Sequence, residues 1–419
     1  MDHFSYKNQL LHAENVSIDK IAASVGTPFY CYSSATLERH FRVFSQAFES
    51  VSATICFAVK ANSNIAVLKT LGDLGSGADC VSEGEIRRAL LAGISPQKIV
   101  FSGVGKTRSE MAYALEQGIF QFNVESRPEL IALNEVATAL SIKAPIAIRI
   151  NPDVDGKTHH KITTGKKENK FGINWEEARD IYKLAATLPG IEIKGISTHI
   201  GSQLLDLEPF RQAFRRVDEL VCALRDDGHR ISRLDLGGGL GIPYDTEEPP
   251  SPQLYADMTI AATRHLGCEL IFEPGRLIAG NAGILVASVI YLKESGSREF
   301  LIVDSAMNDL IRPSFYEAYH EIIPVRQPAD DAQEMPMDIV GPVCETGDIF
   351  AAQRFMPLLE EGDLVAFRSA GAYGAVMAST YNSRLLVPEV LVKGDQFAVI
   401  RKRPSYEEML GLDKLPGWF

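Results

Sequence analysis

The chain has 419 residues, of which 46% are hydrophobic, and its formal net charge is −12. This length and apolar content suit a globular protein of two domains and exclude an intrinsically disordered chain. The negative charge argues against a nucleic-acid partner, which needs a basic face, and no apolar run reaches the length of about 18 residues that a membrane span requires.

A short β-branched run followed by a longer segment of helical period recurs along the first two thirds of the chain. The runs occur at 54–60, 77–82, 98–104, 121–126, 144–152, 191–201, 233–239 and 269–276. Helical candidates between them include 83–94, 109–118, 128–140, 175–188 and 255–266. Eight strand–helix units in about 250 residues predict an α/β fold, a closed (β/α)8 TIM barrel.

The pattern changes after Arg276. Strand-like runs continue at 284–292, 299–305, 337–343, 363–369 and 390–400, whereas segments of helix length are scarce. We therefore expect a C-terminal, mostly antiparallel β domain, a sandwich or barrel, with which the N-terminal segment packs. The predicted domains are the barrel at 35–278 and the β domain at 1–34 and 279–419.

The six cysteines form no C-x-x-C pair and have no histidine neighbours at metal-ligand spacing. We therefore expect reduced thiols, no metal site and a cytoplasmic location. The N-terminus lacks the charged and apolar regions of a secretion signal.

The first predicted strand ends in a lysine, Lys60, within the stretch FAVKAN at 57–62. A lysine at a strand end commonly extends its ammonium into solvent. At the mouth of a barrel, where the carboxyl ends of the strands meet, a partly desolvated amine instead becomes a nucleophile for a carbonyl. We therefore predict that Lys60 forms a Schiff base with pyridoxal 5'-phosphate (PLP).

Two further groups at this rim suit PLP. The stretch DLGGGLG at 235–241 is a tight βα turn, a phosphate-binding loop, or both, because glycines let backbone N–H groups approach a phosphate. It ends the seventh predicted strand, and EPGR at 273–276 ends the eighth, where barrel phosphate sites are commonly found. Glu273 is either a surface glutamate or the carboxylate that keeps the PLP pyridine nitrogen protonated.

Three other stretches have alternative interpretations. His199 ends the sixth strand and is either structural or a ring-stacking or acid–base group at the mouth. The stretch SGVGKT at 102–107 lacks the first glycine of a P-loop, since Val100 stands there, so we reject nucleoside triphosphate binding. The basic insertion at 159–172 is either a solvated loop or, as we prefer, a lid over the mouth.

With these residues identified, the chain resembles the fold-type III PLP-dependent decarboxylases, and among them the diaminopimelate decarboxylases, over nearly its whole length. The motifs that carry the resemblance are, in order, FAVKAN, GADCVSEGE, HHKITTG…KFG, HIGSQ, DLGGGLG, EPGR, RPSFYEAYH, GPVCETGD and GAYG. The resemblance implies a carboxy-lyase that decarboxylates meso-2,6-diaminopimelate at its D centre to L-lysine and CO2, the last step of lysine biosynthesis. It also implies a cytoplasmic homodimer in which the β domain of one chain contributes to the active site of its partner.

The resemblance also implies roles for individual residues. The catalytic residues would be Lys60, which carries PLP, His199, which stacks on its ring, and Cys344, which donates a proton. The cofactor-binding residues would be Lys60, His199, Ser202, Gly239, Glu273, Pro274, Gly275, Arg276 and Tyr373. The substrate-binding residues would be Arg276, Arg312, Tyr316, Glu345 and Tyr373. No metal is implied.

The residue chemistry agrees with diaminopimelate, whose far end carries a carboxylate for the arginines and an ammonium for Glu345. A substrate with only an amine at that end, such as ornithine, would leave Arg312 without its carboxylate. The alternatives are a decarboxylase for ornithine, arginine or carboxynorspermidine, an amino-acid racemase, and a non-catalytic PLP-binding regulator. We expect the last to have lost Lys60 or Cys344, and both are present.

Overall fold

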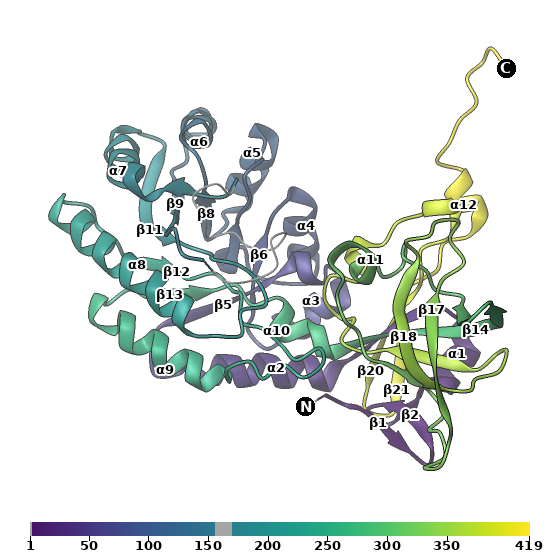
Figure 1. Ribbon diagram of the computed structural model, residues 1–419. Coiled ribbons are helices and arrows are strands. Elements are labelled where there is room, and N and C mark those ends of the chain that lie inside the picture. Colours follow the sequence, from purple (N-terminus) through teal and green to yellow (C-terminus); the bar gives the residue numbers. More distant parts are fainter. Residues whose placement is uncertain (1, 156–169) are drawn as a thin grey trace. The chain divides into compact units, whose positions relative to one another are not determined.

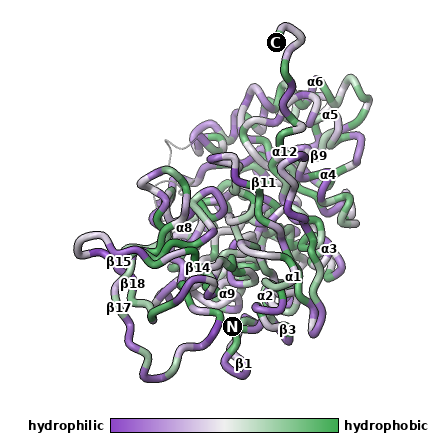
Figure 2. Tube along the Cα trace, turned by 90° about the vertical axis from the view of Figure 1, so that its right-hand side faces the viewer, coloured by the Kyte–Doolittle hydropathy of each residue, from purple (hydrophilic) through white to green (hydrophobic). Residues whose placement is uncertain are grey.

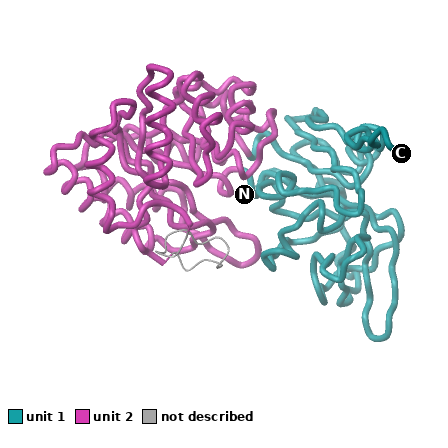
Figure 3. The backbone as a smooth tube through the Cα atoms, turned by 90° about the horizontal axis from the view of Figure 1, so that it is seen from above, with its two compact units in different colours: residues 1–36, 279–419 teal, residues 37–278 magenta. Residues whose placement is uncertain are grey.

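The computed structural model describes residues 2–155 and 170–419 (Figure 1). Its contacts divide the chain into two compact units, one formed by Leu37–Ile278 and the other by Met1–Thr36 together with Ala279–Phe419 (Figure 3). Among the described residues, no helix is both long enough and apolar enough to cross a membrane.

Unit 2, Leu37–Ile278, contains the predicted barrel. Within the described residues, eight parallel strands close on themselves, because β8 pairs with β9 and β13 pairs with β5. These strands are β5 (Ala53–Ala58), β6 (Gly77–Cys80), β7 (Ile99–Phe101), β8 (Gln121–Val124), β9 (Ala144–Asn151), β11 (Ile191–Ser197), β12 (Arg233–Asp235) and β13 (Glu269–Phe272). A two-residue strand, β10 (Ile173–Asn174), adds to β9. The predicted eight-stranded barrel is therefore confirmed.

The helices surround the barrel (Figure 1). They are α2 (Ser34–Ala47), α3 (Ile65–Gly72), α4 (Glu83–Leu91), α5 (Arg108–Gln117), α6 (Arg127–Ala139), α7 (Ala178–Thr187), α8 (Glu208–Asp226), α9 (Pro252–Thr263) and α10 (Arg276–Ala279). Helices α4, α5 and α6 begin at Ser82, Thr107 and Ser126, whose hydroxyl oxygens accept hydrogen bonds from the third backbone N–H beyond. Such caps satisfy amides that the first helical turn leaves without partners, so they fix where each loop at the mouth ends.

Aromatic side chains fill the layer between β13 and the helices α2, α8 and α9. The rings of Phe48 and Phe272 lie 4.1 Å apart between centroids, and those of Phe210 and Tyr255 lie 5.0 Å apart in an edge-to-face arrangement. Each such pair adds about 0.5–1.5 kcal/mol beyond the burial of its area. Figure 2 shows hydrophobic and hydrophilic segments alternating along the chain.

Unit 1 is the β domain. Its larger sheet has the order β18–β17–β15–β14–β4–β20–β21, and β19 and β16 extend it from β14. The pairs are antiparallel except for β15 with β17 and β20 with β4. The strand β4 of the N-terminal segment lies between β14 and β20, so that segment packs within this domain. A smaller sheet contains β1, β2 and β3.

The elements of unit 1 have the following bounds. The strands are β1 (Phe4–Lys7), β2 (Leu10–Ala13), β3 (Val16–Ser17), β4 (Phe29–Ser33), β14 (Gly283–Ser295), β15 (Arg298–Val303), β16 (Ile322–Pro324), β17 (Glu334–Val340), β18 (Ile349–Pro357), β19 (Leu364–Phe367), β20 (Glu389–Lys393) and β21 (Gln396–Arg401). The helices are α1 (Ile18–Val25), α11 (Arg312–Tyr316) and α12 (Tyr406–Leu410). The two helices that follow Arg276 within this unit, α11 and α12, have five residues each, in agreement with the predicted scarcity of helices there.

Candidate active site

Lys60 lies directly after β5, in a single 3-10 turn formed by Val59–Ala61. Its Nζ donates a hydrogen bond of 2.7 Å to Oδ2 of Asp79, near the end of β6. The Asp79 side chain is fully buried, whereas the Lys60 side chain keeps 39% of its exposure. The other carboxylate oxygen, Oδ1, has no hydrogen-bond partner among the described residues. A buried anion thus holds the lysine amine at the mouth, while part of the side chain stays accessible to a ligand.

A buried polar cluster joins the ends of four other strands. The Nδ2 group of Asn123 on β8 donates to Asp235 on β12 at 2.7 Å, to Glu273 after β13 at 3.2 Å and to Ser102 after β7 at 3.0 Å. The Ser102 hydroxyl donates to the same Glu273 oxygen at 3.3 Å. One amide group therefore holds two carboxyl groups that are 38 positions apart in the sequence.

The electrostatics of this cluster favour protonation. Burial raises the pKa of Glu273 well above its ordinary value, and the charges of Asp235 and Asp79 raise it further. Burial also raises the pKa of Asp235 to about 6. The Asn123 amide donates to both carboxyl groups, so it holds them close together, and two buried carboxyl groups at such proximity repel each other when both are ionised. Burial and this repulsion therefore favour a state in which the two groups hold one proton between them.

The glycine-rich loop after β12 can contain only glycine at several positions. A Cβ on Gly238 would lie 2.3 Å from the Glu273 carbonyl oxygen, and one on Gly239 would lie 2.4 Å from that of Gly201. Gly237 and Gly239 also have φ angles of +66° and +116°, which residues with side chains rarely adopt. The loop thus brings bare backbone close to the ends of β11 and β13.

His199, after β11, is neutral. Its Nδ1 accepts a hydrogen bond of 3.2 Å from the Gly238 N–H, so the ring proton is on Nε2. Burial lowers the pKa of His199 well below its ordinary value, and the nearby cations Arg149 and Lys60 lower it further. A neutral ring is suited to stacking on a flat ligand and is not a ready proton donor.

Arg276 opens the short helix α10 after β13 and is buried. Its guanidinium donates to the Ser202 hydroxyl oxygen at 3.1 Å and to the Tyr244 hydroxyl oxygen at 2.6 Å. An arginine with two hydroxyl groups is a set of donors typical of phosphate sites. It follows the eighth strand, where barrel enzymes commonly bind phosphate.

The residues of the mouth fit PLP. Lys60 offers an amine for the aldehyde, and Glu273 a carboxyl group for the ring nitrogen. Arg276 and Ser202 offer donors for the phosphate, and at Gly239 a side chain would collide with backbone. The unsatisfied buried oxygen of Asp79 adds an acceptor that the described residues leave without a donor.

The remaining predicted residues belong to unit 1. Arg312 and Tyr316 lie on α11, with the guanidinium carbon 5.8 Å from the centre of the tyrosine ring. Cys344 and Glu345 lie on the turn before β18, where the Cys344 N–H donates to Asn382 at 2.8 Å.

A hydrogen bond joins helix α11 to this turn. The Ser314 hydroxyl donates to the Gly347 carbonyl oxygen at 2.7 Å, so the structure brings Arg312, Tyr316, Cys344 and Glu345 into one region of unit 1. Tyr373, on a separate loop, has a φ of +56°. A non-glycine residue in this left-handed conformation costs about 1–3 kcal/mol, so the surrounding structure must hold Tyr373 in place.

Several residues of the mouth were not singled out in the sequence. They are Asp79, Ser102, Asn123, Asp235 and Tyr244, which complete the contacts of the predicted residues. The first four share one feature, since each is a polar residue within one position of the carboxyl end of an observed barrel strand, but the predicted strands extend past all four. Most of the predicted lid falls within 156–169, which lies outside the described residues.

Lys106, the lysine of the rejected P-loop match, is buried and bonded within the fold. Its Nζ donates to Glu129 at 2.8 Å and to the carbonyl oxygens of Gly103 and Asn123 at 2.6 and 2.7 Å. The lysine braces the loop after β7 against the end of β8, and these bonds use all three of its N–H donors.

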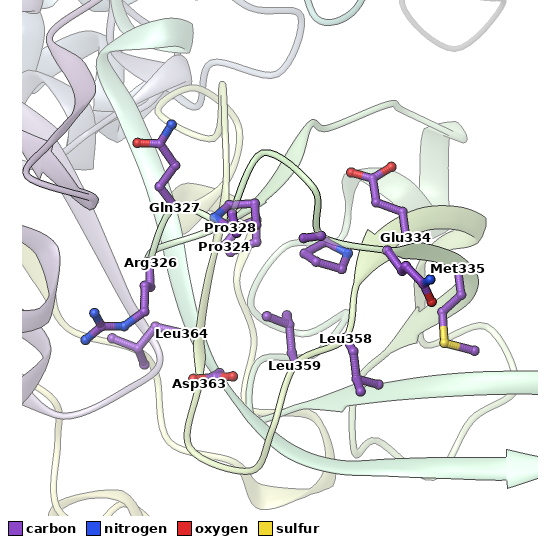
Figure 4. Close-up of a pocket in the computed structure, with 14 residues that line it drawn as sticks. Pro324, Arg326, Gln327, Pro328, Glu334, Met335, Leu358, Leu359, Asp363 and Leu364 are labelled. Atoms are coloured by element: carbon purple, nitrogen blue, oxygen red, sulfur yellow. The ribbon is translucent and has the colours of Figure 1, made fainter.

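A separate pocket of about 530 Å³ lies in unit 1 (Figure 4). Its lining includes Leu358, Leu359 and Leu364, with Arg326 and Glu334 among its polar groups. These residues are not those that the sequence predicted for the active site.

Comparisons with known proteins agree with this geometry. Residues 34–280 match the model of a family described as pyridoxal-dependent decarboxylase, pyridoxal binding domain. A diaminopimelate decarboxylase of Zymomonas mobilis is 51% identical over 420 residues, with 99% of each chain covered, and one of Vibrio cholerae is 50% identical with the same coverage. The crystal structure of diaminopimelate decarboxylase from Helicobacter pylori complexed with L-lysine matches with a TM-score of 0.90 at 43% identity, covering 94% of this chain and 98% of that one.

Proposed function

The chain belongs to the diaminopimelate decarboxylase family of pyridoxal-dependent decarboxylases, and on this premise we propose that it decarboxylates meso-2,6-diaminopimelate at its D centre. The products are L-lysine and CO2, so the chain is a carboxy-lyase of the last step of lysine biosynthesis. The observation that carries the proposal is that one barrel mouth holds both the Lys60 amine, bonded to buried Asp79, and the buried carboxyl group of Glu273.

The mouth residues divide the binding of PLP among them. When bound, PLP supplies an electron sink for the electron pair that departing CO2 leaves on Cα. Lys60 Nζ would attach to the cofactor, and Glu273 would hold the proton at the ring nitrogen. Neutral His199 would stack on the ring. Gly239 and Gly275 would bring backbone to the phosphate, together with the Ser202 and Arg276 side chains and the Pro274 turn.

The residues of unit 1 would complete the reaction. We propose that Cys344 Sγ delivers a proton to Cα on the side that CO2 has left. Arg312, with Arg276, would pair with the carboxylate at the far end of the substrate, and neighbouring Glu345 would pair with its ammonium. Tyr316 and Tyr373 would contact the substrate, and Tyr373 also the cofactor.

We further propose a homodimer in which these residues serve the partner's barrel, with two such shared sites related by a twofold axis. The support is the division of the predicted groups, with Lys60 and Glu273 in one unit of the chain and Cys344 and Tyr373 in the other. A cytoplasmic location is proposed from the cysteine spacing.

The direct test is purified protein incubated with PLP and meso-diaminopimelate, scored for lysine and for CO2. Release of both in equal amounts is expected. Faster CO2 release from ornithine, arginine or carboxynorspermidine would favour a related decarboxylase. Inversion at Cα without CO2 would indicate a racemase, and PLP binding without turnover of any of these would indicate a regulator.

A further inference from the structure

We propose that Asp235 is a positioning residue for the cofactor ring: it holds the Glu273 carboxyl group through a shared proton and ties it to the glycine loop. This inference rests on the proposed use of PLP. It gives one buried side chain control over both the ring-nitrogen end and the phosphate end of the site.

The contacts of Asp235 reach both ends. Its Oδ1 accepts the N–H of Gly237 at 3.1 Å, which fixes the start of the glycine loop. Its Oδ2 accepts from Asn123 at 2.7 Å, and the same Asn123 Nδ2 group donates to Glu273. The side chain is fully buried, so no water competes for these bonds.

The charge of Asp235 gives it a role beyond packing. When the pyridine nitrogen of PLP is protonated, the ring carries a positive charge. Glu273 can keep that nitrogen protonated only if the groups around it stabilise the positive charge. The Asp235–Glu273 pair, which Asn123 holds together, would carry one proton between two carboxyl groups and so a net negative charge next to the ring nitrogen. The pair therefore favours a ring that carries a protonated nitrogen over a ring of the same shape without one.

Other ionisable groups face this pair. Asp79 adds a second negative charge, and Lys60 adds a positive one. The Cys56 thiol on β5 is buried nearby, and burial together with these carboxylates raises its pKa well above the ordinary value, so it stays neutral. A substitution that changes only position 235 leaves these groups in place.

The test compares two ligands. The full-length chain is freed of cofactor, and dissociation constants are measured for PLP and for the PLP analogue in which carbon replaces the ring nitrogen. Asp235→Asn keeps the size of the side chain and removes its charge. It should raise the dissociation constant of PLP by a factor at least about ten times larger than the factor for the analogue. A tenfold difference corresponds to a change of one unit in the pKa of the bound ring nitrogen.

Two further variants sharpen the result. Ser102→Ala removes an uncharged bond to Glu273, and it should change both dissociation constants by similar factors. The double variant Asn123→Asp/Asp235→Asn exchanges amide and carboxylate within the cluster, and it should restore most of the preference for PLP. The double variant also serves as the test if Asp235→Asn fails to fold.

The outcomes separate cleanly. Equal weakening of both ligands by Asp235→Asn would show a structural role alone and would overturn the inference. A variant that binds both ligands as tightly as wild type would also overturn it. A wild-type chain that binds neither ligand would instead refute the proposed function, on which the inference rests.

Discussion

The buried ion pair between Lys106 and Glu129 offers a test of how the barrel supports the site. Their side chains keep 1% and 6% of their exposure, and the Nζ–Oε1 distance is 2.8 Å. Glu129→Gln keeps the shape of the side chain but leaves the Lys106 ammonium buried without its counter-charge. Removing one partner of a buried pair costs about 3–5 kcal/mol.

This magnitude predicts a large thermal effect. A domain of the size of unit 2 loses about 2–4 °C of melting temperature per kcal/mol, so Glu129→Gln should lower the melting temperature by about 6–20 °C. Thermal unfolding followed by circular dichroism measures it. The exposed pair Arg108–Glu135, with side chains 59% and 53% exposed, joins α5 to α6, the helix that also carries Glu129, and serves as a control. Glu135→Gln should cost less than about 1 kcal/mol.

A double-variant cycle then separates the pair from its surroundings. Lys106→Met combined with Glu129→Gln removes both charges, so the double variant should be more stable than the sum of the single effects predicts, by up to about 3 kcal/mol. Two results would refute this reasoning about the buried ion pair. One is that the two single variants have additive effects on the free energy of unfolding, and the other is that Glu129→Gln lowers it by less than about 1 kcal/mol.

Four further predictions concern the site itself. Lys60→Ala should abolish turnover and the visible absorbance of the bound cofactor, and full activity without added amines would exclude the assigned role. Glu345→Gln should lower kcat/KM for diaminopimelate by an amount equivalent to about 2–5 kcal/mol, because it removes the charge-assisted bond to the distal ammonium that the proposed dimer would enclose; an unchanged value would contradict this. In the cofactor-free protein, the pKa of Asp235 is raised from 3.8 to about 6, so the stability that this group contributes is present below pH 4 and is lost as the pH rises through 6. Asp235→Asn should therefore gain about 3 kcal/mol relative to wild type between pH 3 and pH 7 in urea unfolding, and a difference independent of pH would count against the raised pKa. Mixing Lys60→Ala chains with Cys344→Ala chains under subunit exchange should restore about one quarter of wild-type activity, because half of the dimers are mixed and each has one intact site. Exchange without recovery would rule out a shared site.

Much of the fold could be predicted because its signals are local. Each predicted strand from 54–60 to 269–276 has a counterpart in the structure, shorter by one to four residues at its carboxyl end. The predicted strands are too long because their ranges include the first loop residues at the mouth, such as Lys60 and Gly237–Gly239. The short strands β1 to β3 were not predicted, since two to four residues show no clear alternation.

The sequence by itself determined that the chain forms a barrel and which rim carries its chemistry. Strand and helix periods are properties of neighbouring residues, and parallel strands place all their carboxyl ends at one mouth. Lys60, Glu273 and the glycine loop could therefore be assigned to one rim from their positions alone. Their motifs also identified the family.

Only the tertiary structure decided which side chains share a proton or a hydrogen bond. Asn123 meets Asp235 across 112 positions and Glu273 across 150, and Asp79 meets Lys60 across the β5–β6 pair. These contacts depend on the stagger and tilt with which the barrel closes, and no local pattern encodes them. The burial that raises the pKa of Glu273 and lowers that of His199 likewise arises only when the barrel and its helices exclude water from the mouth.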